Sequence, residues 1–206
     1  MFITFEGGEG AGKSTQIALL ANLLTDSFGT KVVVTREPGG TELGETIRKL
    51  ILAERPAVPE TEFLLFAAAR AEHIATTIGP ALDNGSWVLC DRFIDSTRVY
   101  QGRLGGVSST LIEAIEAETL KNRVPDLTII LDIPAQLSID RARSRGALSR
   151  YDCADIDQHA LLREGFLDIA KAEPGRCIVV DGSRSADDVA NDVFCRVTKR
   201  FAKELG

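Results

Sequence analysis

The sequence predicts an α/β fold in which a five-stranded parallel sheet carries helices on both faces. Short apolar runs alternate along the chain with longer segments of helical period, which is typical of a parallel sheet with right-handed crossover connections. The runs are continuously apolar, as expected for strands covered on both faces. The five expected strands are Phe2–Phe5, Lys31–Thr35, Ser86–Cys90, Leu127–Ile133 and Cys177–Val180.

The segments between these runs carry apolar residues at helical spacing. One apolar face near the N-terminus consists of Ile17, Leu20, Ala21, Leu24 and Phe28. Another, behind a capping box formed by Ser185 and Asp188, consists of Val189, Val193, Val197, Phe201 and Leu205. Further helices are expected over Leu43–Leu52, Glu60–Leu82, Ser109–Asn122, Gln136–Arg145 and Asp157–Ala172.

Length and composition predict one domain spanning residues 1–206. The chain is 44% hydrophobic and 26% charged, and no Pro/Gly/Ser-rich linker divides it. A net charge of −6 disfavours a nucleic-acid polymer as partner. The four cysteines include no C-x-x-C pair, so no zinc site is expected, and Cys90 and Cys177 are interpreted as small buried side chains. Without a signal peptide or an apolar run of membrane-spanning length, the chain is expected to be cytoplasmic, with no membrane partner.

A phosphate-binding loop follows the first expected strand and opens the first expected helix. Residues 7–14 read GGEGAGKS and match G-x-x-x-x-G-K-[ST]. The glycines let backbone N–H groups converge on phosphate oxygens, and the helix N-terminus faces the same anion. The residues expected to hold the phosphates are Gly7, Gly8, Glu9, Gly10, Ala11, Gly12, Lys13, Ser14 and Thr15. This sequence context predicts a P-loop NTPase fold that binds a nucleotide.

Glu9 is an unusual residue in this loop, because a carboxylate beside a triphosphate is electrostatically unfavourable. We therefore expect a second role for it, holding a sugar hydroxyl or a metal-bound water. The alternative is an acid that is simply solvated on the loop.

An acidic residue at the end of an apolar strand is the expected second ligand of Mg²⁺, beside the Ser14 hydroxyl. Asp91, Asp132 and Asp181 all occupy such positions. Arg92 favours Asp91, because a guanidinium next to the metal-binding acid can bridge two phosphate groups with its planar fork. The alternative for Arg92 is an ordinary salt bridge at the strand end.

Several separate stretches resemble the thymidylate kinase family. They are residues 91–102 (DRFIDSTRVYQG), residues 35–41 (TREPGGT) and residues 66–70 (FAAAR), in the order and spacing of that family. The resemblance runs from the phosphate loop to the C-terminal helix. It implies a nucleoside monophosphate kinase-like enzyme that transfers the γ-phosphoryl group of ATP to dTMP, with Mg²⁺ bound to ATP. It also implies a homodimer formed through helices packed side by side.

The resemblance assigns roles on the acceptor side. Phe66 would stack on thymine, Arg70 would bond a thymine carbonyl, and Glu9 would face the 3′-hydroxyl. Arg92 would bind the acceptor phosphate, and Tyr100 would crowd the sugar C2′ position. Other residues implied for this side are Arg36, which helps to bind the phosphate, Glu37 and Pro38 at the sugar-phosphate end, and Ser96, Thr97 and Gln101 near the base. The alternatives are a core aromatic for Phe66 and a solvated helix charge for Arg70.

Four arginines fall close together after the fourth expected strand, and they resemble the lid of the bacterial subgroup, whose phosphate loop lacks an arginine. This lid is expected over about residues 141–153. Arg145 is the first candidate for neutralising transition-state charge, with Arg143 and Arg150 assisting or holding the adenine side. Ser149 and the Tyr151-Asp152 pair depart from the subgroup pattern. The alternative is a solvated helix face.

Three other functions remain to be weighed against a dTMP kinase. Another P-loop nucleoside or nucleotide kinase would share the loop but take a different acceptor. A regulatory nucleotide switch would need an N-K-x-D string, which the sequence lacks. A nucleic-acid-dependent ATPase is disfavoured by the acidic net charge and by the acceptor motifs.

Overall fold

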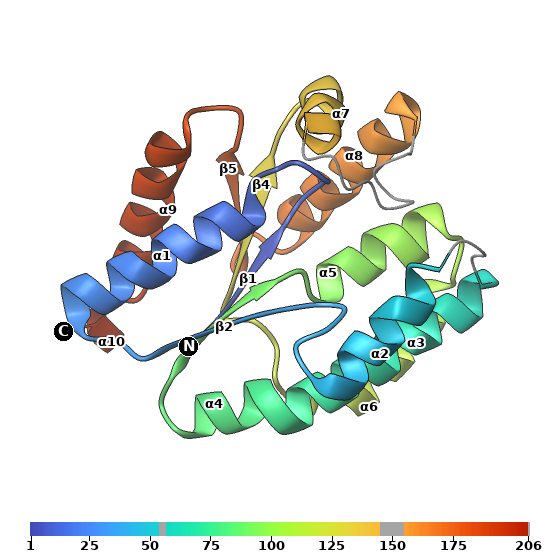
Figure 1. The fold of residues 1–206 in the computed structure, drawn as a ribbon, viewed down its shortest axis with the longest axis horizontal. Helices are drawn as coiled ribbons and strands as arrows, with labels where there is room; N and C mark the ends of the chain where they lie inside the picture. The colour runs from blue at the N-terminus through green and yellow to red at the C-terminus, as the bar shows by residue number, and fades with distance from the viewer. Residues whose placement is uncertain (54–56, 145–154, 206) are drawn as a thin grey trace.

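The computed structural model describes residues 1–53, 57–144 and 155–205. Its centre is a sheet of five parallel strands in the order β2-β3-β1-β4-β5, with helices on both faces (Figure 1). The strands are β1 (Phe2–Glu6), β2 (Val32–Arg36), β3 (Trp87–Asp91), β4 (Leu127–Asp132) and β5 (Cys177–Asp181). The predicted fold class and all five expected strands are confirmed.

Apart from α5 and η2, the helices occupy the segments in which the sequence shows helical spacing. They are α1 (Lys13–Phe28), α2 (Glu42–Ile51), α3 (Pro59–His73), α4 (Gly79–Asp83), α5 (Ile94–Thr97), α6 (Ser109–Leu120), α7 (Ala135–Ser144), α8 (Ile156–Ala172), α9 (Ala186–Arg200) and α10 (Ala202–Leu205), with π-helical segments η1 (Ile74–Ile78) and η2 (Arg98–Leu104). Ser185 caps α9 by accepting a hydrogen bond from the Asp188 amide, as half of the expected capping box.

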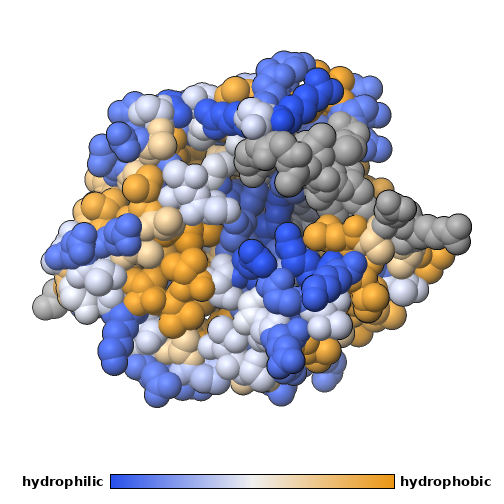
Figure 2. All heavy atoms as spheres, viewed as in Figure 1, coloured by the Kyte–Doolittle hydropathy of each residue, from blue (hydrophilic) through white to orange (hydrophobic). Residues whose placement is uncertain are grey.

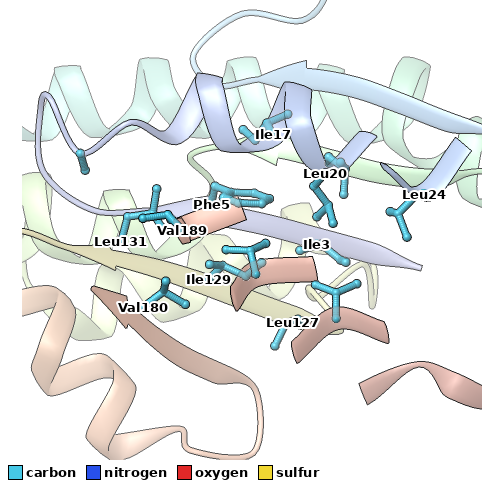
Figure 3. Close-up of a cluster of buried hydrophobic side chains, with 14 of the residues drawn as sticks. Ile3, Phe5, Ile17, Leu20, Leu24, Leu127, Ile129, Leu131, Val180 and Val189 are labelled. Carbon is cyan, nitrogen blue, oxygen red and sulfur yellow. The ribbon is translucent and has the colours of Figure 1, made fainter. Parts of the chain in front are cut away.

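Alternate residues of the central strand face two different apolar layers. Ile3 and Phe5 point toward α1 and α9, where Leu20 and Val193 complete the largest buried cluster. Figure 3 shows this cluster between α1 and the sheet. Phe2 faces the opposite layer, which also contains η1 residues. Burial on both sides explains why β1 is a continuous apolar run.

The two edge strands are less covered than their sequences predict. Val34 of β2 is 53% exposed and Val179 of β5 is 37% exposed. The expectation that every strand is covered on both faces is therefore wrong for β2 and β5. Each has a strand neighbour on one side only, so the flanking helices do not reach over it completely.

Two helical details differ from the sequence prediction. The expected helix over residues 60–82 is interrupted by the π-helical η1, which ends at Ile78, shortly before Pro80. Proline has no N–H to donate within a helix, and a π-turn accommodates this loss. The segment after β3, which the sequence does not mark as helical, forms α5 and η2. Val99 of η2 packs against Gly165 of α8, where a Cβ atom would lie 2.9 Å from a Val99 methyl.

The carboxyl ends of all five parallel strands lie at one edge of the sheet, where ligands bind in open α/β folds. The predicted phosphate loop and Asp91 both lie at this edge. Within the described ranges, no helix has both the length and the apolar character needed to cross a bilayer.

Candidate active site

The phosphate loop between β1 and α1 has a backbone that requires its glycines. Gly7, Gly10 and Gly12 have φ values of 132°, 73° and 90°. A Cβ atom on Gly7 would lie 2.6 Å from the Leu131 carbonyl oxygen, and one on Gly10 would lie 2.6 Å from that of Ser138. Gly12 provides no side-chain cap for α1, so the helix N-terminus is available to an anion.

Lys13 begins α1 and folds back over the loop. Its Nζ donates hydrogen bonds to the carbonyl oxygens of Gly7 (3.2 Å) and Gly8 (2.8 Å). The side chain is buried, and burial lowers the pKa of the ammonium group, as does the nearby Arg92 charge. A desolvated cation held at the loop is suited to binding phosphate oxygens.

Ser14 and Asp91 form a pair of oxygen groups beside the loop. The Ser14 hydroxyl donates to Asp91 Oδ2 over 2.7 Å, because β3 lies next to β1 in the sheet. The other two strand-end acids are engaged elsewhere: Asp132 accepts two hydrogen bonds from Arg163, and Asp181 accepts from Ser183. The geometry thus brings Asp91 to the Ser14 hydroxyl, while Asp132 and Asp181 have other partners.

A Mg²⁺ ion fits the chemistry of this pair, because Mg²⁺ prefers oxygen ligands and commonly takes one or two from protein and the rest from phosphate and water. Among the described residues there is no group of three or more His, Cys, Asp or Glu side chains placed to hold a metal. Ser14 and Asp91 therefore suit an ion that arrives with a nucleotide.

Arg92 follows β3 in the left-handed backbone region, with φ at 67°. Its Nη1 donates to Gly7 O and to Ser96 Oγ, each over 3.1 Å, and its Nη2 donates to Glu9. Its Cζ lies 5.0 Å from the centre of the Tyr100 ring. Burial alone would lower the pKa of the guanidinium, but the nearby charges of Glu9, Tyr100, Asp91 and Glu6 together outweigh burial and raise the pKa. Arg92 is therefore a permanent cation at the loop.

Glu9 is held by its neighbours and is not a solvated loop acid, so that alternative is wrong. Its Oε1 accepts from Arg92 and, over 3.3 Å, from the Tyr100 hydroxyl. Arg92 does form a salt bridge, as its alternative stated, and its partner is Glu9 of the phosphate loop. An incoming anion would compete with Glu9 for the same guanidinium.

Glu6, at the end of β1, has a positioning role that sequence reasoning missed. It is fully buried and accepts hydrogen bonds from the Phe93 amide (2.7 Å), the Ser96 hydroxyl (2.6 Å) and the Ser96 amide (3.3 Å). These bonds hold the turn that presents Arg92. Burial, with the nearby Asp95 charge, raises the pKa of Glu6 to about 7. The sequence feature that could have indicated this role is an acidic residue at the end of an otherwise apolar strand.

Replacing Glu6 by glutamine is expected to flatten the dependence of stability on pH. The pKa of Glu6 is about 7 in the folded protein, against an ordinary value of 4.5. Between these values the folded state holds a proton that the unfolded chain has lost. The protonated Glu6 side chain therefore contributes fully to the free energy of unfolding at low pH. This contribution, roughly 3 kcal/mol in total, is lost as the pH rises through about 7.

Urea unfolding measured from about pH 5 to about pH 8 checks this expectation. The wild type should lose more stability over that range than the Glu6→Gln variant. Glu118→Gln, which removes an exposed acid of α6, should behave like the wild type. Equal slopes for wild type and Glu6→Gln would contradict the expectation.

A buried polar cluster joins the loop after β2 to α3. Arg70 Nε donates to Glu37 Oε2 over 2.8 Å, and Glu37 Oε1 lies 3.0 Å from His73 Nδ1. Arg70 Nη2 also donates to Thr97 Oγ1 and to the Phe93 carbonyl. Arg70 is 3% exposed, so the solvated-charge alternative is wrong. Its Nη1 makes no hydrogen bond to any residue that the structure describes, which leaves the two N–H groups of this nitrogen for a ligand.

His73 is a second residue that the sequence did not reveal. Its ring is buried. Nε2 lies 2.6 Å from Thr35 Oγ1, and Nδ1 lies 3.0 Å from Glu37 Oε1. It connects the end of β2 to α3. A lone histidine on a helix carries no signal of such a role, because its partners are 36 and 38 residues away.

The remaining acceptor-side residues lie on helices around this cluster. Phe66 of α3 is half-buried and packs against Ile47 and Ala69, so it contributes to a core cluster, as the alternative stated. Gln101 is buried and donates to Glu62 over 2.9 Å. Pro38 follows Glu37 through a cis peptide bond.

A cleft of about 240 Å³ brings many of the predicted residues together. Figure 2 shows a recessed hydrophilic region near the middle of this face. The cations that line this cleft include Arg48 of α2, which the sequence did not indicate as a site residue. Arg36, which is paired with Glu45, also borders the cleft. The lining residues are Glu9, Gly10, Ala11, Gly12, Lys13, Ser14, Thr15, Arg36, Glu37, Arg48, Asp91 and Arg92.

The arginines of the expected lid divide between described and undescribed residues. Arg141 belongs to α7, and its guanidinium donates to the carbonyl oxygens of Gly182 (2.9 Å) and Ser183 (3.3 Å). Arg143 is exposed in the last turn of α7. Arg145 and Arg150 lie outside the described residues. A second cavity, of about 310 Å³, lies between the phosphate loop, Arg141 and Arg184.

A P-loop, an acid beside its serine and a guanidinium from the end of β3, all lining one cleft, define the class: a P-loop phosphotransferase. Comparison with known proteins gives the family. The thymidylate kinase family profile matches residues 5–193, and the chain belongs to the thymidylate kinase family.

Individual relatives agree over nearly the full chain. A thymidylate kinase of Bradyrhizobium sp. (strain ORS 278) is 48% identical over 205 residues, covering 97% of this chain and 90% of the relative. One of Rhodopseudomonas palustris (strain BisB18) is 49% identical over 206 residues, covering 97% and 89%. The crystal structure of thymidylate kinase from Ehrlichia chaffeensis superposes with a TM-score of 0.80 at 37% identity, covering 96% of this chain and 98% of that chain.

Proposed function

We propose that this protein transfers the γ-phosphoryl group of ATP to dTMP, giving ADP and dTDP for the synthesis of dTTP. The observation that carries the proposal is the cleft of about 240 Å³, which the phosphate loop and Arg92 both line. Membership of the thymidylate kinase family supports the same reaction. Two phosphate groups bound in one cleft can be held in line for transfer.

The phosphate loop and the arginines that line the cleft have separate roles in this proposal. The loop backbone and Lys13 hold the donor phosphates. Arg92 holds the acceptor phosphate, assisted by Arg36 and Arg48, because all three guanidiniums border the cleft. A phosphate monoester is already anionic near neutral pH, so no general base is needed. Positioning and charge neutralisation then account for the catalysis.

Mg²⁺ is proposed to bind at Ser14 and Asp91, where it would neutralise phosphate charge. The support is the 2.7 Å contact between the two side chains beside the loop. The protein would supply only these two oxygen groups, in keeping with the small number of protein ligands that Mg²⁺ usually takes.

The base and sugar of dTMP are proposed to lie against α3 and η2. Phe66 would stack on thymine, and Nη1 of Arg70, which has no hydrogen-bond partner among the described residues, would reach a thymine carbonyl. Thr97 is buried and accepts from Arg70, which supports a role in orienting that arginine. Tyr100 would crowd the sugar C2′ position. The assigned acceptor-side residues remain Arg36, Glu37, Pro38, Phe66, Arg70, Arg92, Ser96, Thr97, Tyr100 and Gln101.

Lid arginines are proposed to complete the donor side. Arg145 would neutralise charge in the transition state, with Arg143 and Arg150 assisting or contacting adenine. The carbonyl contacts of Arg141 support a different role for that residue, which joins α7 to the loop after β5.

A homodimer in the cytoplasm is proposed as the working form. Apolar side chains are exposed along α2 and α3, among them Leu43 (50%), Leu50 (59%) and Leu64 (48%). Such a surface suits helix-to-helix packing between two copies. The cytoplasm is proposed because it contains both nucleotide substrates.

A coupled assay of ADP formation with dTMP, dUMP, dCMP, AMP and thymidine tests the function. dTMP is expected to give the highest kcat/KM. The dTMP methyl group should favour it over dUMP by about 10- to 200-fold, the usual effect of one methyl group in an apolar pocket. Faster turnover with any other acceptor would identify a different P-loop kinase.

A further inference from the structure

Behind the phosphate loop, two side chains that have no role in the proposed reaction connect the loop to the helix layer. Ser138 of α7 donates a hydrogen bond to the Glu9 carbonyl oxygen. His159 of α8 lies next to it, with Nδ1 3.4 Å from Ser138 Oγ. Both side chains are buried, each with an exposed fraction of 3%. The three residues form a chain from α8 through α7 to the loop.

The direction of the hydrogen bonds in this chain follows from the available protons. A serine hydroxyl has one proton, and a carbonyl oxygen can only accept, so the Ser138 proton is used on Glu9. Toward His159, Ser138 Oγ can therefore only accept, so a hydrogen bond between the two side chains requires a proton on Nδ1. Each donor in such a chain polarises the next bond.

The other ring nitrogen of His159 is also buried. His159 Nε2 has no hydrogen-bond partner among the described residues. His159 also borders a cavity of about 10 Å³ next to Gly7 and Gly8. A buried polar atom without a partner costs stability, and an apolar side chain of similar size would avoid that cost. The histidine is thus better explained by what its other nitrogen does for the loop.

We propose that His159 is a positioning residue for phosphoryl transfer, acting through Ser138 on the backbone of Glu9. The loop rests on α7 at this point, since a Cβ atom on Gly10 would lie 2.6 Å from the Ser138 carbonyl oxygen. The held residue, Glu9, carries the carboxylate that faces Arg92. These hydrogen bonds thereby set the position of the phosphate loop relative to the Arg92 guanidinium. The inference rests on the proposed function of both groups.

Four variants test the proposal. His159→Leu removes both ring nitrogens, and Ser138→Ala removes the hydrogen bond to Glu9. The double variant removes both hydrogen bonds between α8, α7 and the loop. His159→Asn keeps a donor near the position of Nδ1. His159→Leu and Ser138→Ala are each expected to lower kcat roughly 10-fold or more, because small misplacements of reacting groups cost rate. The KM values should change less than kcat, since the substrates' own contacts remain.

The expected pattern separates positioning from general damage. His159→Asn should recover kcat to within about threefold of wild type, and the double variant should be about as slow as the slower single variant, because both changes break one chain. Thermal unfolding of His159→Leu should match or exceed wild type, since an unpartnered nitrogen is gone. Wild-type kcat in His159→Leu, or multiplying losses in the double variant, would overturn the proposal.

Two further provisions keep the result interpretable. If His159→Leu does not fold, Ser138→Ala compared with His159→Asn still decides, because the first should be slow and the second close to wild type. All variants are measured with whichever acceptor the wild-type enzyme turns over fastest. A failure of the dTMP assignment would then appear in the wild type, and a failure of the positioning role only in the variants.

Discussion

Replacing Lys13 by alanine is expected to lower kcat by roughly 10³-fold or more, equivalent to about 4 kcal/mol of transition-state stabilisation. The ammonium group lies over the phosphate loop, bonded to two of its carbonyl oxygens. It is already desolvated, so it interacts strongly with phosphate charge that develops during transfer. The fold should survive, because burial of the ammonium is itself unfavourable, as the lowered pKa of Lys13 indicates.

Coupled ADP formation and thermal unfolding together check this result. Lys13→Met, which keeps the length of the side chain, should be as inactive as Lys13→Ala. Lys171→Ala serves as a matched control, because it removes one lysine of α8 that is 75% exposed and should leave kcat unchanged. A Lys13 variant that is folded and retains wild-type kcat would remove the phosphate-loop assignment.

Replacing Arg92 by lysine is expected to lower kcat/KM for dTMP by about 10²-fold, and replacing it by alanine by about 10³-fold. Lysine keeps the charge but loses the planar fork that can hold two phosphate oxygens at once. The lysine ammonium also cannot reproduce the separate bonds that Nη1 makes to Gly7 and Ser96 and Nη2 makes to Glu9. Both variants keep the Cβ atom, so the left-handed backbone at this position is unaffected.

Steady-state kinetics with dTMP varied at saturating ATP measure this effect. Arg196→Lys is the control, because Arg196 is a half-exposed arginine of α9 paired only with Asp192 among the described residues. It should behave like the wild type. If Arg92→Lys keeps kcat/KM for dTMP within threefold while remaining folded, the acceptor phosphate is not held by this guanidinium.

The features that the sequence predicted well depend on neighbouring residues. The phosphate loop is one example: its glycines and Lys13 stand in one short stretch, and the chemistry follows from their order. The strands β1, β3 and β4 are others, because burial on both faces makes each a continuous apolar run. In both cases the physical cause acts within about ten residues of chain.

The features that the sequence missed depend on residues far apart in the chain. Glu6 meets Ser96 across 90 positions, and His73 meets Glu37 across 36. No periodicity or motif marks these partners, because each bond exists only after the strands and helices have packed. The same is true of Arg48, whose position beside the cleft follows from how α2 lies against α3.

Taken alone, the amino-acid sequence determined the α/β class, the order of strands and helices, the phosphate loop and the acceptor motif at residues 91–102. The tertiary structure decided which of three strand-end acids meets Ser14, that Arg70 is buried against Glu37, and that Glu9 occupies the guanidinium of Arg92. Backbone geometry and apolar burial are set by local residue types. The pairing of charged and polar groups is set by which elements become neighbours, and only the packed sheet and its helices determine that.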